Sequence, residues 1–234
     1  MRSSVGSLRA GCGGFPVARS TYFLALDTVE VGGFAGLPRP ETAERWRREA
    51  PRGFVVAVVC SRAVTGALLR PTAEVREGWE ATLRVARAVQ AGFIVLETPP
   101  AFYANGDHLR DMYALLRAAE RAEAVLVWQP ARAWDAALAG KVCRDLRLVR
   151  AVDPLVEAPP EGGLNYFRLR GGGEGRKPSR GHRYSDAELK TVLERAGGRP
   201  TYAFFLTAEG WRDSRRLAAL ARPMPKVGPG RVRY

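Results

Sequence analysis

The sequence predicts one α/β domain of barrel size, built from repeated strand–helix units around a parallel sheet. The chain has 234 residues, and this length suits a single barrel domain better than two small domains. Short apolar runs alternate with helical patterns along the chain, and this alternation favours βα units. We expect about seven or eight strands in total.

The first predicted elements follow that alternation. Residues 28–31 are a short strand, and Pro40 begins a helix that runs to Glu49, because proline is favoured in the first turn of a helix. Residues 54–60 form a continuous apolar, β-branched run, as expected of a strand buried on both faces. A helix over residues 72–91 follows, with its large apolar residues at helical spacing.

The middle of the chain repeats the pattern. Residues 93–97 are predicted to form a strand that a Thr-Pro-Pro sequence ends, and residues 106–122 to form a helix. The next predicted strand is 124–128, followed by a short helix over 134–138 and a strand over 146–152.

The last third supplies two more strands, residues 164–169 and 201–206. The helix over 185–196 begins with a capping box, since Ser185 is followed by Glu188 three residues later. A strongly basic helix over residues 211–220 closes the pattern.

The predicted barrel domain spans residues 1–222. Residues 223–234 form a basic tail rich in proline and glycine, which we expect to be loosely held or docked on the barrel.

The composition is that of a globular protein with a large excess of positive charge. Hydrophobic residues make up 46% of the chain and the formal net charge is +13, almost all of the basic residues being arginine. Arginine presents a planar fork of donors that suits phosphate and carboxylate, and so strong a charge favours polyanionic partners such as nucleic acid. The alternative is a general bias toward arginine, with many of the charges neutralised locally.

Cysteine and histidine usage argues against a metal centre or a cofactor. Cys12, Cys60 and Cys143 are widely spaced and form no CxxC pair, and His108 and His182 fall at a helix start and in a loop. The odd number of cysteines and the lack of a signal-peptide pattern favour a reducing, cytoplasmic location. No apolar run approaches the length of a membrane span, so we expect no membrane association.

The most informative motif is the aromatic strand that ends in Arg168 and Arg170. Residues two apart on a strand share a face, so both guanidinium groups are expected on the same side of the sheet. The glycine-rich, basic loop over 171–177 that follows offers exposed N–H groups to a phosphate or another anion. The alternative is a solvated surface loop after an ordinary core strand.

The same region resembles the DUF72 (YecE-like) family. Tyr166-Phe167-Arg168-Leu169-Arg170-Gly171 is similar to its Tyr-x-Arg-x-His-Gly signature, and the sequence from Tyr184 to Leu189 is similar to its Tyr-Ser-x-x-Glu-Leu signature. Further similarities are Gly11 to Phe15, Val29-Glu30-Val31, Phe34 with Leu37-Pro38, and Trp46 to Pro51 followed by Phe54. The resemblance covers roughly residues 10 to 222 and rests on the order and spacing of these motifs. It implies a TIM-type (β/α) barrel as a single domain, with no established activity.

The chain departs from the family at polar positions. Where the family usually has Lys, His, Glu and Asn, this sequence has, in that order, Val59, Arg170, Trp128 and either Leu206 or Thr207. Glu97 replaces a glutamine and Gly66 a histidine, whereas Glu30, Asp153, Arg168 and Tyr184 keep the family type. A catalytic family site would therefore be lost or altered here.

A closed barrel places functional side chains at the carboxyl ends of its strands. The candidates there are Glu30, Arg62, Glu97, Trp128, Asp153, Arg168, Arg170 and Thr207. We predict Glu30, Asp153 and Arg168 as candidate catalytic residues, because carboxylates serve as general acids or bases. For binding an anionic substrate, the candidates are Arg168, Arg170, Tyr184 and Glu97. Buried structural salt bridges among these acids and arginines are the alternative.

Basic clusters in the C-terminal third suggest a second site. The predicted nucleic-acid-binding residues are Arg176, Lys177, Arg180 and Arg183 in one loop and Arg212, Arg215 and Arg216 on the last helix. The tail adds Lys226, Arg231 and Arg233, and the aromatic residues Tyr166, Trp211 and Tyr234 are nearby in sequence. Separate solvated patches are the alternative to one continuous face.

Two functions remain open, and whether the protein is an enzyme is undecided between them. The first is binding of nucleic acid or another polyanion through a basic C-terminal face. The second is an enzyme acting on a phosphorylated or otherwise anionic small substrate at the barrel mouth. The sequence gives no oligomeric state.

Overall fold

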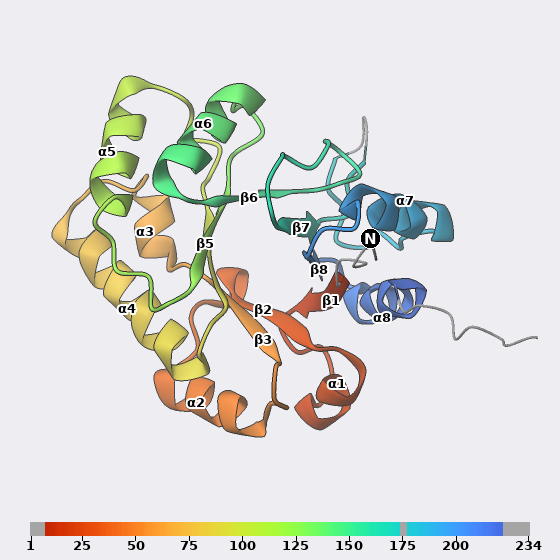
Figure 1. Ribbon diagram of the computed structural model, residues 1–234. Helices are drawn as coiled ribbons and strands as arrows, with labels where there is room; N and C mark the ends of the chain where they lie inside the picture. The colour runs from red at the N-terminus through yellow and green to blue at the C-terminus, as the bar shows by residue number, and fades with distance from the viewer. Residues whose placement is uncertain (1–7, 174–176, 222–234) are drawn as a thin grey trace, which may run out of the picture.

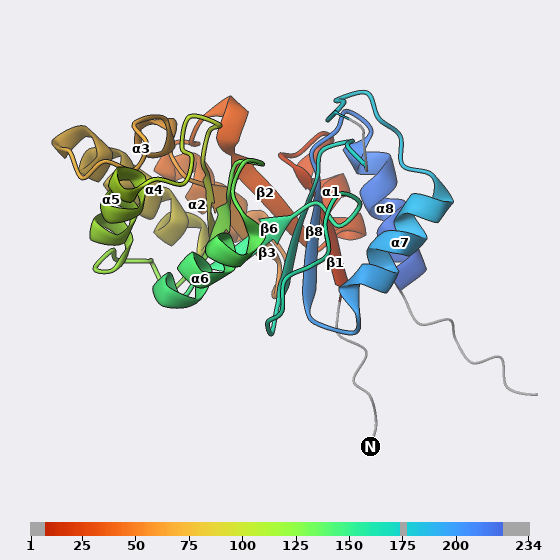
Figure 2. The same ribbon diagram turned by 90° about the horizontal axis from the view of Figure 1, so that it is seen from above.

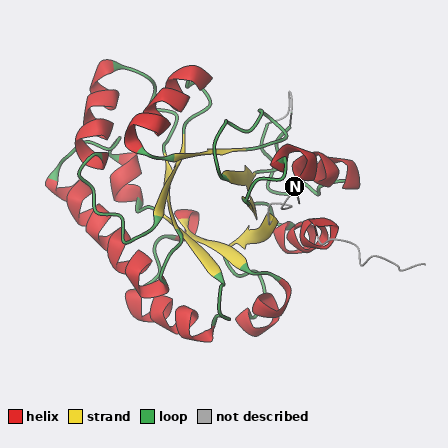
Figure 3. Ribbon diagram, in the orientation of Figure 1, coloured by secondary structure: helices red, strands yellow, loops and turns green. Residues whose placement is uncertain are grey.

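Eight parallel strands form one closed barrel in the computed structural model, which describes residues 8–173 and 177–221. The strands follow one another around the barrel in chain order, and the last pairs with the first, with Leu8 opposite Thr201. Helices surround the ring of strands (Figures 1 and 3). The TIM-type barrel expected from the sequence is confirmed.

The eight strands are each four to six residues long: β1 (Leu8–Gly13), β2 (Thr28–Gly32), β3 (Val55–Val59), β4 (Phe93–Glu97), β5 (Val125–Gln129), β6 (Val149–Val152), β7 (Asn165–Leu169) and β8 (Thr201–Phe205).

The helices in the described ranges are α1 (Arg19–Ala25), α2 (Pro40–Glu49), α3 (Arg62–Gly66), α4 (Ala73–Val89), α5 (Gly106–Leu116), α6 (Ala136–Leu146), α7 (Asp186–Ala196) and α8 (Gly210–Ala221), with a short 3-10 helix η1 (Gly33–Ala35). The segment 153–164 joins β6 to β7 without a helix. The capping box predicted at Ser185 and Glu188 is present.

β1 and α1 were not predicted from the sequence. The β1 sequence contains two glycines and an arginine, so it lacks the apolar run by which the other strands were recognised. Gly11 is needed there, because a Cβ atom at this position would lie 2.4 Å from the carbonyl oxygen of Thr28 on β2. Close packing of backbone against backbone therefore forms this strand.

Three predicted boundaries were also wrong. The short helix over 134–138 is the longer α6, because Asp135 caps its start by accepting from the Leu138 N–H and the helix buries Val142 and Leu146. The strand that follows begins at Val149, not at residue 146, as α6 ends just before it. The helix predicted over 106–122 ends at Leu116.

The interior of the barrel is filled with side chains. One buried cluster combines inward-facing residues of six strands, from β3 to β8: Ala57, Val59, Phe93, Val95, Val127, Ala151, Tyr166 and Phe204. The outward-facing strand residues pack against the helices in two further clusters, a large one and a smaller one that includes β7, β8, α7 and α8. Because this interior cluster is mainly apolar, polar chemistry inside the barrel is confined to its carboxyl-terminal mouth. No helix in the described part of the chain combines the length and the apolar character needed to cross a membrane.

Candidate functional site

Arg168 of β7 crosses the barrel mouth to Glu30 of β2. Its Nε donates to both carboxylate oxygens of Glu30, at 3.2 and 3.1 Å, and its Nη2 donates to Oε1 at 2.7 Å. Both side chains are only 3% exposed. The two strands are not neighbours, since β8 and β1 lie between them, so this contact joins separate parts of the barrel wall.

Two other strands add polar groups to Arg168. Its Nη1 donates to Oε2 of Glu97 at 2.8 Å and to Oε1 of Gln129, at the ends of β4 and β5. Tyr166, two residues before Arg168, donates its hydroxyl to Glu30 at 2.9 Å. The guanidinium group is therefore held by protein acceptors from three strands, which leaves it little capacity for a ligand.

Arg170 extends this arrangement toward solvent. It donates through Nη2 to the second carboxylate oxygen of Glu97. The Arg170 and Glu97 side chains are 33% and 37% exposed, so they form the accessible edge of an otherwise buried cluster. We refer to Glu30, Glu97, Gln129, Tyr166, Arg168 and Arg170 together as the mouth network.

The charges of the mouth network compensate one another. Burial acts to raise the pKa of Glu97, but Arg168 and Arg170 lower it to about 2. Burial likewise acts to lower the pKa of Arg168, and the carboxylates of Glu30 and Glu97 outweigh it and raise that pKa. Glu97 and Arg168 are thus ionised at neutral pH, and an incoming anion would have to compete with two carboxylates for the two guanidinium groups.

Asp153 lies beside the mouth network and contacts it through the backbone N–H of Arg170. Its Oδ1 accepts from the Leu155 N–H at 3.0 Å and its Oδ2 from the Arg170 N–H at 3.4 Å. Burial raises the pKa of Asp153, although these two backbone N–H groups act in the opposite direction. The structure therefore brings Glu30 and Arg168 together, while Asp153 bonds to the backbone after β6 and β7.

Tyr184 has a position different from the other anion-binding candidates. It is buried, and its hydroxyl accepts from the Gly171 N–H at 2.6 Å. The ring meets Phe205 and His182 edge-on. Tyr184 thus fixes the turn that follows β7, where Gly171 has a φ of 74°.

The remaining candidates at strand ends are Trp128, Arg62 and Thr207, and each has different surroundings. The prediction for Trp128 was wrong: it is fully buried in the outer core, and its indole donates to Thr98 Oγ1 at 3.1 Å. Its neighbour Gln129, which the sequence analysis missed, faces the mouth instead. Arg62 is exposed at the start of α3, and the buried Oγ1 of Thr207 has no hydrogen-bond partner.

The basic loop lies against the start of α8. The Ala208 N–H donates to the carbonyl oxygen of Arg180 at 2.7 Å, and Arg183 contacts Glu209 at 3.4 Å. Lys177, Arg180 and Arg183 are exposed. The basic loop therefore contacts the residues that immediately precede α8. Arg176 and the tail residues Lys226, Arg231, Arg233 and Tyr234 lie outside the described residues.

The three arginines of α8 have different surroundings. Arg212 and Arg215 are exposed, whereas Arg216 donates to Asp213 at 2.8 Å, to Asp186 at 2.5 Å and to the Tyr184 carbonyl at 2.6 Å. Arg216 thus joins α8 to α7, which lie side by side in Figures 1 and 2. We refer to Lys177, Arg180, Arg183, Arg212 and Arg215 together as the basic face.

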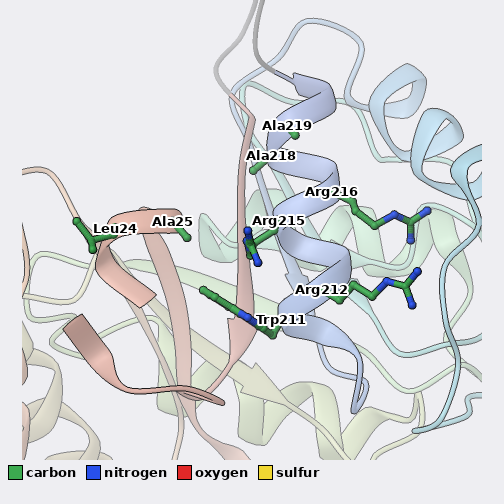
Figure 4. A pocket seen from close by; sticks show the side chains of 8 residues that line it. All are labelled: Leu24, Ala25, Trp211, Arg212, Arg215, Arg216, Ala218 and Ala219. Carbon is green, nitrogen blue, oxygen red and sulfur yellow. The ribbon is translucent and has the colours of Figure 1, made fainter. Parts of the chain in front are cut away.

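A groove of about 610 Å³ adjoins the basic face between α1 and α8. Its lining consists of Leu24, Ala25, Trp211, Arg212, Arg215, Arg216, Ala218 and Ala219 (Figure 4). The Arg215 guanidinium lies over the Trp211 ring, 5.3 Å from its centroid. Tyr166, by contrast, is fully buried inside the barrel, so it is not available to stack on a base.

Within residues 8–173 and 177–221, no group of three or more His, Cys, Asp and Glu side chains is arranged to hold a metal ion. The three cysteines are buried and unpaired.

Comparisons with known proteins place the chain among barrels of unknown function. The family model described as "Protein of unknown function DUF72" matches residues 19–227. A DUF72 family protein from Enterococcus faecalis is similar in structure, with a TM-score of 0.72 at 12% identity, over 97% of this chain and 100% of that one. A DUF72 family protein from Thermotoga maritima gives a TM-score of 0.68 at 16% identity, over 91% and 98%.

Endonuclease IV from Thermus thermophilus is also similar, with a TM-score of 0.57 at 13% identity, over 91% of this chain and 98% of that one. At such identities these likenesses show the fold alone. No curated protein matches the chain by sequence.

Proposed function

The chain belongs to the DUF72 family, and from this premise we propose that it binds nucleic acid or another polyanion through the basic face. One observation carries the proposal. The arginines of the mouth network are neutralised by Glu30 and Glu97, whereas Arg212 and Arg215 form no ion pair with any described residue and are exposed.

Exposed, unpaired guanidinium groups suit phosphate. Each can donate two parallel hydrogen bonds to phosphate oxygens, and neither has to give up a carboxylate partner first. The basic loop lies against the same end of α8, so several phosphates of one strand can be contacted together. Binding of this kind releases counterions and has little sequence preference.

The test measures how the affinity for an oligonucleotide depends on salt. We expect binding at low salt, and a double variant, Arg212→Gln with Arg215→Gln, should flatten the plot of log affinity against log salt by roughly one unit per lost contact. Arg216 is left unchanged, because it holds Asp186 and Asp213.

A matched control keeps the change in net charge equal. Arg76 and Arg84 are exposed arginines on α4, far from α8 on the other side of the barrel (Figure 1). Replacing both with Gln removes the same charge but should leave the salt slope unchanged. No binding at low salt would refute the proposal, and so would equal slopes in the two double variants.

A second candidate function is suggested by the surroundings of Arg170. Its side chain is partly exposed at the mouth, and its backbone N–H contacts Asp153, the acid whose pKa burial raises. An enzyme acting on a phosphorylated or anionic small substrate would use Arg168 and Arg170 as the anion clamp and Asp153 or Glu30 as acid or base. Calorimetric titration with inorganic phosphate tests this. If the heat of phosphate binding is lost in Arg170→Gln but retained in the α8 double variant, phosphate binds at the barrel mouth. If the wild type gives no heat of binding, a phosphate clamp at the mouth is excluded.

A further inference from the structure

We infer that the groove between α1 and α8 receives an unpaired nucleobase, stacked on the guanidinium plane of Arg215. This inference rests on the proposed polyanion binding and names the part of the ligand that enters the groove. It implies that the preferred partner is a single strand, since the bases of a duplex are already stacked and paired.

The stacking surface is supported from the core. Tyr22 is fully buried, and its hydroxyl accepts from the Cys12 N–H and donates to the Thr28 carbonyl, both at 2.9 Å. Its ring lies 5.5 Å from that of Trp211, tilted by 30°. Trp211 in turn carries the Arg215 guanidinium. Because this series of contacts orients Arg215 before any ligand arrives, less side-chain freedom is lost on binding.

The opposite side of the groove is apolar and open. Leu24 of α1 is 90% exposed, so its apolar side chain is accessible to a ligand in the groove. It lies across the groove from Arg215 in Figure 4, and the small side chains of Ala25 and Ala218 leave space between α1 and α8. A flat apolar group placed here would cover Leu24 and face the guanidinium plane at the same time.

The groove and the basic face together fit the two parts of a nucleotide. The cavity of about 610 Å³ is within the usual range for small-ligand sites, roughly 300–1,000 Å³. Arg212 leaves α8 on the side away from Leu24, so it remains available to the phosphates that flank an inserted base (Figure 4). Arginine planes and aromatic rings are the surfaces on which proteins stack splayed bases.

The experiment compares strands with and without bases. Fluorescence anisotropy at low salt would measure the affinity for an oligothymidylate of about 12 nucleotides and for an abasic strand of equal length and charge. The wild type should prefer the strand with bases by at least about five-fold, the lower end for one base stack. The same comparison with an oligouridylate distinguishes RNA from DNA as the source of the base, and a preference in either series supports the inference.

Two variants locate the stack. Arg215→Lys keeps the charge but loses the plane, so the ratio of the two affinities should fall to about one, whatever phosphate affinity the lost guanidinium fork removes from both strands alike. Arg212→Lys is the matched control on the same helix and should keep the preference. Leu24→Ser, at an exposed position, should reduce the preference without affecting folding.

The outcomes separate this inference from the function on which it rests. Equal binding of strands with and without bases would overturn the groove while leaving the polyanion site in place. No binding of either strand would refute the proposed function itself. A base preference that persists unchanged in Arg215→Lys would also overturn the inference, since the stack would then lie elsewhere.

Discussion

Removing the cation at the centre of the mouth network should destabilise the fold strongly. In Arg168→Met, Glu30 would remain in a site where its side chain is 3% exposed, with the Tyr166 hydroxyl as its remaining hydrogen-bond partner among the described side chains. Breaking a buried ion pair from one side costs about 3–5 kcal/mol. A domain has roughly 5–15 kcal/mol of stability in total, so urea unfolding followed by circular dichroism should show a large drop in midpoint.

The double variant Arg168→Met with Glu30→Met shows whether the loss of stability comes from the missing attraction or from a buried Glu30 charge without a partner. With both charges gone, we expect the double variant to recover at least half of that loss, about 2 kcal/mol relative to Arg168→Met. Arg170→Met is the control, because Arg170 is 33% exposed and Glu97 keeps Arg168, so the cost should stay below about 1 kcal/mol. Additive losses in the double variant, or a loss below about 1 kcal/mol in Arg168→Met, would refute the structural role of the network.

Three further predictions concern single positions. Burial acts to raise the pKa of Glu97, but Arg168 and Arg170 lower it from 4.5 to about 2. The stability advantage of the wild type over Glu97→Gln should therefore disappear as the pH falls through that window. Because the Glu97 side chain is 37% exposed, this advantage should not exceed about 1 kcal/mol. For Asp153 the dependence of stability on pH should have the opposite sign. Burial raises its pKa, so stability is lost as the pH rises through the raised value, and Asp153→Asn should flatten that part of the unfolding curve against pH. Gly171→Ala should cost about 1–3 kcal/mol, because its φ is 74° and an added Cβ would lie 2.2 Å from the Ser179 carbonyl oxygen, whereas Gly181→Ala, with open space around it, should unfold like the wild type.

The fold could be predicted wherever an element carries an apolar pattern. The valine-rich β3 and the capped α7 are of this kind, since side-chain burial and capping are visible in short stretches of sequence. β1 was missed because it is held by backbone pairing with β2 and β8, and its glycine at position 11 is required by a neighbour that lies elsewhere in the chain. Local periodicity does not report such a contact.

The candidate site shows a similar division. The rule that barrel chemistry gathers at strand ends found Glu30, Glu97 and Arg168, which the structure joins through direct hydrogen bonds. Gln129 was missed because the predicted strand ended at Trp128. Since side chains alternate between the two faces of a strand, an error of one residue exchanges a mouth residue for an outer-core residue.

The sequence does not reveal whether a given arginine is already paired with a carboxylate in the fold. Arg168 and its partner Glu30 are 138 residues apart, and nothing near Arg168 in the chain indicates that a carboxylate will meet it across the barrel. Arg212 and Arg215 belong to an equally basic stretch in which Arg216 is engaged by Asp186 and Asp213. The net charge of the chain therefore overstates the number of arginines that are available to bind anions. Only the ion pairs seen in the fold distinguish arginines that hold the barrel together from arginines without a carboxylate partner. This distinction is what makes the surface and the mouth separable by mutation: changes on the basic face should alter salt-dependent binding with little loss of stability, whereas changes at Arg168 should alter stability first.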